Sequence, residues 1–172
     1  MEMYREGPET TRLLHQAMKV EDAEDVFAFN SDPLVMQYTG ESPWESLELT
    51  RQRLRDYPDF TRHGFGRWGC RLKSTGRVIG FSGFKFLPEL EEVELGYRFL
   101  PEYWGQGLAT ESARACVAFG LKTIGLPYIV GLVLPENVAS MRVLQKAGMH
   151  DTGLIESEGD IVHRFLIEGP AT

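Results

Sequence analysis

The 172-residue sequence contains no long apolar run, no excess of positive charge and only two cysteines. Its net charge of −7 argues against general nucleic-acid binding, because such binding needs a basic surface. No apolar run approaches the roughly 18 residues that a membrane span requires, and residues 1–10 contain no apolar core of a signal peptide. We therefore expect a globular protein without membrane or nucleic-acid partners.

The two cysteines predict neither a metal site nor a disulfide framework. Cys70 lies in a strand-like pattern and Cys116 on an apolar helical face. Neither has a Cys-x-x-Cys partner or a nearby histidine, so no metal is expected, and buried packing is favoured over a catalytic thiol. Two unpaired cysteines without a signal peptide are typical of the reducing cytoplasm, which is the predicted location.

The length and the ordinary composition predict a single domain over residues 1–172, with its core at about residues 11–167. The chain contains no internal repeat, low-complexity segment or linker. A homodimer is compatible with the sequence, although no motif specifies the oligomeric state.

Apolar periodicity predicts an α/β fold in which helices flank a mixed sheet. Strands are expected at residues 11–17, 65–72, 78–86, 91–100, 128–134, 149–156 and 161–167. Helices are expected at residues 20–29, 42–57, 108–122 and 137–147, the second opened by the capping box Ser42-Pro-Trp-Glu45. The predicted order is β-α-α-β-β-β-α-β-α-β-β, with a hairpin turn at residues 74–76.

The most informative segment is residues 97–111, in which a strand runs into a Gly-rich loop and then a helix. Small residues allow close approach to the backbone, and the helix N-terminus favours negative charge, so the loop predicts a bound phosphate. A dinucleotide site is disfavoured, because Thr110 stands at the third glycine position and no acidic residue follows about 20 positions later. A P-loop is excluded by the absence of Gly-Lys-Ser/Thr, which leaves a simple capping turn as the alternative.

A second motif, Asn137-Val-Ala-Ser140 with Lys146-Ala-Gly-Met149, follows about 30 residues later. Together with Trp104-Gly-Gln-Gly107-Leu-Ala109, it resembles the GNAT acetyltransferase superfamily, and the resemblance spans residues 11–167. The segments Glu94-Leu-Gly-Tyr97 and Asn30-Ser-Asp-Pro33-Leu-Val-Met36 resemble the ribosomal-protein N-acetyltransferase (RimJ/RimL-like) branch.

This resemblance implies acetyl-CoA as co-substrate, bound without a metal. The expected contacts come from the strand end, the loop and the following helix: Phe99, Leu100, Trp104, Gly105, Gln106, Gly107, Leu108, Ala109, Thr110, Asn137 and Lys146. Trp104 stands where the superfamily commonly has Gln or Arg, which removes one polar phosphate contact. Asn137 also suits a helix N-cap, and both of its roles stay open.

The resemblance also implies two catalytic residues. Glu94 is expected to act as general base by holding a water and removing the proton through it, with a solvated strand face as the alternative. Many family members protonate the departing thiolate with a tyrosine, but Leu144 occupies that position here. Ser140 is the substitute that the branch suggests, and a polar group in the first helical turn is its alternative role.

The expected reaction is direct acetyl transfer to a primary amine. Deprotonating a lysine at neutral pH costs roughly 4 kcal/mol, against less than about 1 kcal/mol for an α-amine. Without an evident strong acid–base pair, a protein N-terminal α-amine is therefore the predicted acceptor. A small-molecule amine acetyltransferase and a non-catalytic acyl-CoA-binding module are the alternatives.

Overall fold

The strands form one mixed sheet in the order β1-β2-β3-β4-β5-β6-β8-β7. The computed structural model describes residues 1–170, with β1 (Glu6–Glu9), β2 (Leu13–Ala17), β3 (Arg67–Leu72), β4 (Val78–Leu87), β5 (Glu92–Phe99), β6 (Tyr128–Val133), β7 (His150–Ser157) and β8 (Asp160–Glu168). Neighbouring strands are antiparallel except β5 and β6, which run parallel. The predicted α/β fold with a mixed sheet is confirmed.

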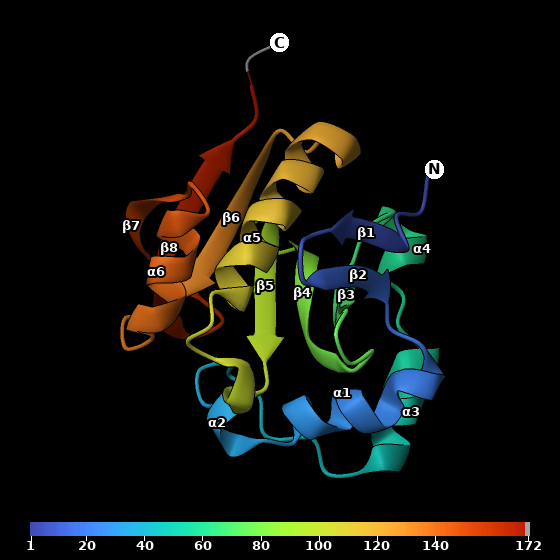
Figure 1. Cartoon of the computed structure of the whole chain (residues 1–172). Helices are drawn as coiled ribbons and strands as arrows, with labels where there is room; N and C mark the ends of the chain where they lie inside the picture. Colours follow the sequence, from blue (N-terminus) through green and yellow to red (C-terminus); the bar gives the residue numbers. More distant parts are fainter. Residues whose placement is uncertain (171–172) are drawn as a thin grey trace.

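The helices lie in two groups around this sheet. α5 (Leu108–Phe119) and α6 (Val138–Lys146) lie over its middle, whereas α1 (Ala23–Asn30), α2 (Pro33–Met36) and α3 (Leu47–Arg55) gather at the end where β5 terminates (Figure 1). The remaining elements are α4 (Asp59–His63), the turns η1 (Val20–Asp22) and η2 (Pro101–Tyr103), and the π-helical turn η3 (Gly120–Ile124) that extends α5.

The main core fills the space between the sheet and α5. Trp68, Phe84 and Phe165 are fully buried there, and the small side chains of Ala113 and Cys116 let α5 pack closely against them. A separate cluster fixes α1 to β4 and contains Val26, Phe29, Val78, Phe81 and Leu100.

From residue 65 onward, the predicted elements agree with the structure to within a few residues, including the β3–β4 hairpin. The helix predicted at residues 108–122 ends as an α-helix at Phe119 and continues as the wider π-helical turn η3. Before residue 65 the agreement is poorer. The strand predicted at residues 11–17 begins at Leu13, and β1, α2 and α4 were missed because each is too short to show periodicity.

The helix predicted from Ser42 is wrong, because α3 begins at Leu47. Ser46 caps this helix instead, and its side chain accepts a hydrogen bond from the third helical N–H group. The backbone N–H of Trp44 donates to the carbonyl of Asn30 at 2.9 Å, which holds the intervening segment against α1 in an irregular conformation.

β5 and β6 separate soon after they meet. In the part of the chain that the structure describes, they share one bridge pair, Glu94 with Val130, whereas β4 and β5 pair from Gly80–Phe99 to Leu87–Glu92. The two parallel strands diverge towards their C-terminal ends (Figure 1). The sheet is therefore open at its centre, next to the loop that precedes α5.

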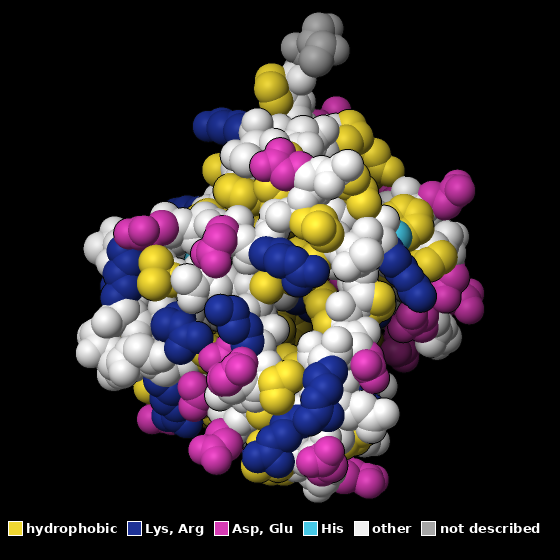
Figure 2. Space-filling view, turned by 90° about the vertical axis from the view of Figure 1, so that its right-hand side faces the viewer, with side chains coloured by type: hydrophobic (Ala, Val, Ile, Leu, Met, Phe, Trp, Pro, Cys, Tyr) yellow, Lys and Arg dark blue, Asp and Glu magenta, His cyan; other side chains and the backbone are white. Residues whose placement is uncertain are grey.

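The surface carries charges of both signs. On the face shown in Figure 2, which is the right-hand side of Figure 1, Lys and Arg side chains are interspersed with Asp and Glu. This face therefore offers no extended field of one sign for a polyanion. Within residues 1–170, no helix combines the length and the apolar character that a membrane crossing would need.

A buried polar network connects β2 with α5. His15 Nδ1 lies 2.8 Å from the carbonyl oxygen of Pro8, and His15 Nε2 lies 2.7 Å from Ser112 Oγ. Because a carbonyl can only accept, Nδ1 carries the hydrogen and Nε2 accepts from the serine hydroxyl. His15 and Ser112 are therefore satisfied in the core and are not available as a nucleophilic pair.

Both cysteines are buried free thiols beside this network. Cys70 Sγ lies 3.9 Å from Ser112 Oγ, and Cys116 Sγ lies 3.4 Å from Ser82 Oγ. Burial raises the pKa of both thiols, that of Cys116 to about 12, so they pack as small apolar groups. Among residues 1–170, no three His, Cys, Asp or Glu side chains are grouped as metal ligands.

Because His15 is neutral in the folded protein, we predict that the free energy of unfolding depends on pH. Burial lowers the pKa of His15 below its ordinary 6.5, although the hydrogen bond to Pro8 opposes the shift. The unfolded chain therefore binds a proton that the folded protein does not, and the free energy of unfolding should fall as pH drops below about 6.5. Urea denaturation across this range should show that component in the wild type and in His150→Gln, at an exposed histidine, but not in His15→Gln. An identical pH dependence in all three proteins would contradict this account.

Candidate active site

A cavity of about 700 Å³ opens where β5 and β6 diverge. It is lined by most of the residues predicted for catalysis and cofactor binding: Glu94, Phe99, Trp104, Gly105, Gly107, Leu108, Ala109, Thr110, Asn137, Ser140 and Lys146. Leu100 and Gln106 do not line it. Leu100 packs into the core beside α1, and the Gln106 side chain donates to the carbonyl of Glu102. Two sequence motifs about 30 residues apart thus meet in one cavity.

The cavity reaches both faces of β5. Successive residues of a strand point to opposite faces, and the lining includes both alternating sets, Leu95, Tyr97 and Phe99 on one face and Glu94, Gly96 and Arg98 on the other. We call the part formed by the loop and α6 the loop end. The part formed by Arg67, Phe81, Glu94 and Arg98 is the Glu94 end.

The loop before α5 presents its backbone at the loop end. Gly105 and Gly107 adopt φ values of 74° and 78°, a left-handed conformation that favours glycine, and Gly107 is the N-cap of α5. Trp104 folds back over the strand end, where its indole Nε1 donates to the carbonyl of Phe99 at 2.7 Å. Within residues 1–170, no side chain caps the N–H groups of the first turn of α5, so they can bind an anion.

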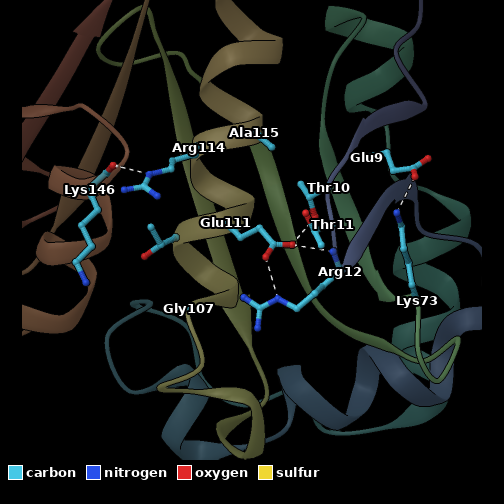
Figure 3. Close-up of a pocket in the computed structure, with 11 residues that line it drawn as sticks. Glu9, Thr10, Thr11, Arg12, Lys73, Gly107, Glu111, Arg114, Ala115 and Lys146 are labelled. Carbon is cyan, nitrogen blue, oxygen red and sulfur yellow. Dashed lines mark hydrogen bonds and ion pairs between the residues drawn. The ribbon is translucent and has the colours of Figure 1, made fainter.

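Arg12 and Glu111 clamp this loop to the turn between β1 and β2 (Figure 3). Arg12 Nε donates to Glu111 Oε1 at 2.8 Å, and Arg12 Nη1 donates to the carbonyl of Gln106 at 2.9 Å. Thr10 Oγ1 donates to Glu111 Oε2 at 2.6 Å. Although burial opposes it, these bonds hold the pKa of Glu111 below its ordinary value. The clamp therefore fixes the loop through a side chain of α5 itself.

A second, wider hollow of about 1190 Å³ lies beside the clamp, between the β1–β2 turn and α5 (Figure 3). Lys73 is paired there with Glu9 at 2.6 Å. Arg114 Nε donates to the backbone carbonyl of Lys146 at 2.9 Å, and Lys146 lines both this hollow and the cavity. Arg114 and Lys146 thus place positive charge beside the loop end.

Glu94 lies at the narrow point where β5 and β6 are still paired. Its side chain is only 17% exposed, so it does not belong to a solvated strand face, unlike the exposed Glu91. Burial raises the pKa of Glu94 above its ordinary value, although the nearby charges of Arg67 and Lys85 oppose the shift. A carboxylate with a raised pKa is a stronger base, which suits proton removal near neutral pH.

Tyr97 is a candidate functional residue that sequence reasoning missed. Its hydroxyl lies 2.7 Å from Ser140 Oγ and 3.1 Å from the carbonyl oxygen of Ser140, at the loop end. Burial raises the pKa of Tyr97 to about 12, although the bond to Ser140 opposes the shift. Strand alternation assigned Tyr97 to the apolar face, and nothing in the sequence indicated that its hydroxyl meets α6.

Two further positions that the sequence singled out, Asn137 and Leu144, lie at the start of α6 and within it. The Asn137 side chain accepts from the N–H of Ser140 at 3.3 Å, so its capping role is present while it also lines the cavity. Leu144, which stands where the family often has tyrosine, is 1% exposed and packs against Gly131 of β6. Leu144 therefore packs into the core at the edge of the cavity and offers no hydroxyl, whereas Tyr97 and Ser140 place two hydroxyl groups next to each other at the loop end.

Two arginines at the Glu94 end were also missed, because Arg67 lies outside every recognised motif and Arg98 was given no role within the strand end that precedes the loop. The guanidinium carbons of Arg67 and Arg98 lie 4.8 Å and 5.0 Å from the centre of the Phe81 ring. Arg67 Nη2 lies 3.9 Å from Glu94 Oε1. The Glu94 end therefore combines one buried carboxylate with two cations on a shared aromatic ring.

Comparison with known proteins agrees with this geometry. The family model described as "Acetyltransferase (GNAT) domain" matches residues 12–150. The N-acetyltransferase YoaA of Bacillus subtilis, itself named as uncharacterized, is 33% identical over 149 residues, which cover 86% of this chain and 84% of YoaA. The spermidine N(1)-acetyltransferase of Escherichia coli strain K12 is 27% identical over 156 residues, which cover 87% of this chain and 75% of that enzyme.

A solved structure shows the same architecture. The crystal structure of a GNAT-family acetyltransferase from Bacillus anthracis superimposes with a TM-score of 0.79 at 28% identity, covering 94% of this chain and 97% of that one. The family model covers well over half of the sequence. The chain therefore belongs to the GNAT acetyltransferase family and is an N-acetyltransferase.

Proposed function

We propose that this enzyme transfers acetyl directly from acetyl-CoA to a primary amine, with the α-amine of a protein N-terminus as the acceptor. The observation that carries the proposal is the buried Glu94 in one cavity with the Gly-rich loop and the hydroxyl pair of Tyr97 and Ser140. The segment Glu94-Leu-Gly-Tyr97 supports a place in the RimJ/RimL-like branch. The two free cysteines agree with a cytoplasmic location.

The loop end fits the diphosphate of acetyl-CoA. A Cβ atom at Gly105 would meet nothing within 4 Å, so the space around this part of the loop is open. The first-turn N–H groups of α5 supply donors for one phosphate, and Arg114 and Lys146 supply charge for another. When bound, the thioester supplies an activated acetyl group. Asn137 and Thr110 also line the cavity and are proposed to contact the remainder of the cofactor.

Glu94 is the group proposed to remove the proton from the amine. The general base must be ionised before it can accept, and its raised pKa increases its affinity for the proton that it takes. An α-amine reaches its neutral form at a cost of less than about 1 kcal/mol at neutral pH, against roughly 4 kcal/mol for lysine. One buried carboxylate therefore suits an α-amine better than a lysine side chain.

Tyr97 and Ser140 are proposed to return a proton to the departing thiolate. With a pKa of about 12, Tyr97 keeps its proton at neutral pH. Its hydroxyl donates to the Ser140 carbonyl at 3.1 Å and can turn to donate to Ser140 Oγ at 2.7 Å, and it regains from solvent any proton that it passes on. The serine hydroxyl can then donate into the cavity. These two hydroxyls would thus supply the proton to the thiolate, which the apolar side chain of Leu144 cannot do.

Glu94→Gln should lower kcat by about 100-fold or more and leave the KM for acetyl-CoA unchanged, because the amide cannot accept the proton. In the wild type, kcat/KM should rise with pH through the raised pKa of Glu94, in addition to the rise from the acceptor amine itself. The variant should keep only the rise from the amine. Steady-state thiol release measures kcat, the KM for acetyl-CoA and the pH dependence of kcat/KM. Glu91→Gln, at an exposed neighbouring residue, is the control and should behave as wild type. Full activity of Glu94→Gln would refute the assignment.

Ser140→Ala and Tyr97→Phe should each lower kcat by about tenfold, because either change interrupts the same relay. The double variant should lose little more than one single variant, as expected for groups that act as a unit. Tyr128→Phe, at a tyrosine outside the cavity, is the control. Multiplicative losses in the double variant would show that the two hydroxyls act independently.

Glu111→Gln should weaken acetyl-CoA binding several-fold and lower the free energy of unfolding by about 1 kcal/mol, because the clamp on the loop loses its charge-assisted bonds. The KM of the acceptor should not change. Calorimetric titration with CoA and thermal unfolding measure the two effects. Glu9→Gln, which removes an ion pair in the same hollow, should leave CoA affinity unchanged. Equal effects of the two variants would rule out the clamp.

A further inference from the structure

The sheet gives Arg67 an open path to the active site. Arg67 of β3 pairs with Gly83 of β4, which pairs with Gly96 of β5. Directly paired residues point to the same face of a sheet, so two glycines leave the row beside Arg67 without side chains. A Cβ atom at Gly96 would lie 3.2 Å from Arg67 Nη2, which shows that the guanidinium occupies this space.

At the Glu94 end, the hydrogen-bonding capacity of Arg67 is not used. Among residues 1–170, Arg67 Nε is buried and has no hydrogen-bond partner. The 3.9 Å between Arg67 Nη2 and Glu94 Oε1 is an electrostatic contact that is too long for a hydrogen bond. A buried donor without a partner costs free energy, and a ligand that accepts from it recovers that cost.

The guanidinium of Arg98, in the same part of the cavity, does have hydrogen-bond partners. Its Nη1 donates to Asn30 Oδ1 at 2.9 Å, and its Nη2 donates to Glu41 Oε2 at 2.7 Å. The side chain is 10% exposed and supports the segment between α2 and α3. Arg98 thus belongs to the wall of the cavity, whereas Arg67 lines the cavity with a guanidinium whose Nε has no partner in the part of the chain that the structure describes.

At the Glu94 end, and within residues 1–170, Arg67 is the guanidinium that has no carboxylate within hydrogen-bonding distance. Two guanidinium groups share the Phe81 ring and line the cavity with one carboxylate, Glu94. The other nearby carboxylate, Glu41, is already bonded to Arg98. A polyamine offers Arg67 no hydrogen-bond acceptor, whereas a carboxylate can accept from its guanidinium.

We propose that Arg67 binds a carboxylate of the acceptor close to the amine that is acetylated, which makes Arg67 a residue that determines specificity. The proposal rests on the function proposed above, in which Glu94 faces the amine. Since Arg67 and Glu94 are only 3.9 Å apart, the carboxylate and the amine must be separated by few covalent bonds. A free α-amino acid satisfies this spacing, and so does a peptide that begins with Asp or Glu. Arginine suits the task because its planar N–H groups bind a carboxylate in pairs.

The test compares acceptors that differ only in this charge. Thiol release from acetyl-CoA is measured with free amino acids and their C-terminal amides, with peptides that begin with Asp or Glu and with Asn or Gln, and with spermidine. In the wild type, the carboxylate member of at least one kind of pair should exceed its amide in kcat/KM by about tenfold or more. The pair that shows the difference identifies the source of the carboxylate.

Arg67→Gln should abolish this preference and leave the KM for acetyl-CoA unchanged. Arg71→Gln is the matched control, because Arg71 lies on the same strand but pairs with Asp22 outside the cavity. Gly96→Ala should reduce the preference by displacing the Arg67 guanidinium, which gives a second variant if Arg67→Gln folds poorly. Equal losses for the carboxylate and amide acceptors in Arg67→Gln would overturn the proposal, since they would mean that Arg67 serves Glu94 alone. Higher kcat/KM for spermidine than for every carboxylate acceptor would also overturn it.

A binding measurement separates this proposal from the proposed function. The melting temperature of the CoA-bound protein should rise with a carboxylate acceptor in the wild type, and less with its amide or in Arg67→Gln. Turnover of amines without a carboxylate preference would refute the role of Arg67 and leave the acetyl transfer standing. Selective stabilisation without turnover of any amine would support Arg67 as a binding residue and refute the proposed reaction.

Discussion

The divergence of β5 and β6 is the constraint on which the rest of the structure depends. Two parallel strands in the middle of a sheet normally pair along their length, yet here they share one bridge pair at Glu94. Beyond that pair the sheet is open, and a cavity passes from one face to the other. In the proposed reaction each face supplies one part: α5 and α6 present N–H groups and hydroxyl groups, and the opposite face presents a partly buried carboxylate and two arginines.

This geometry explains why residues from distant parts of the chain act together. The clamp of Arg12 on Glu111 ties the β1–β2 turn to the loop before α5, so the first strands of the sheet fix the loop end. The side chain of Arg67 on β3 extends across Gly83 to Gly96 on β5. The strand register at the centre of the sheet therefore positions the Glu94 end. The positions of both ends therefore depend on strand pairing rather than on flexible loops.

The sequence predicts the fold well, and most of the residues that it predicts for cofactor binding line one cavity, for a physical reason. The loop around Gly107 and the cap at Asn137 are local features, in which spacing alone determines where backbone groups point. The bond between Tyr97 and Ser140 and the position of Arg67 depend on strand register and on how α6 docks, which spacing does not encode. The helix start near Trp44 was misplaced for the same reason, because a tertiary hydrogen bond to Asn30 outweighed a local capping pattern.

The measurement that tests this account most directly is a crystal structure of the protein with CoA and a carboxylate-bearing amine. The account predicts that the diphosphate lies on the N–H groups of the first turn of α5. It also predicts that the thiol lies within hydrogen-bonding distance of Ser140 Oγ, and that the amine lies at Glu94 with its carboxylate on Arg67. CoA bound in the hollow beside Glu9 and Lys73, with the gap between β5 and β6 empty, would contradict it.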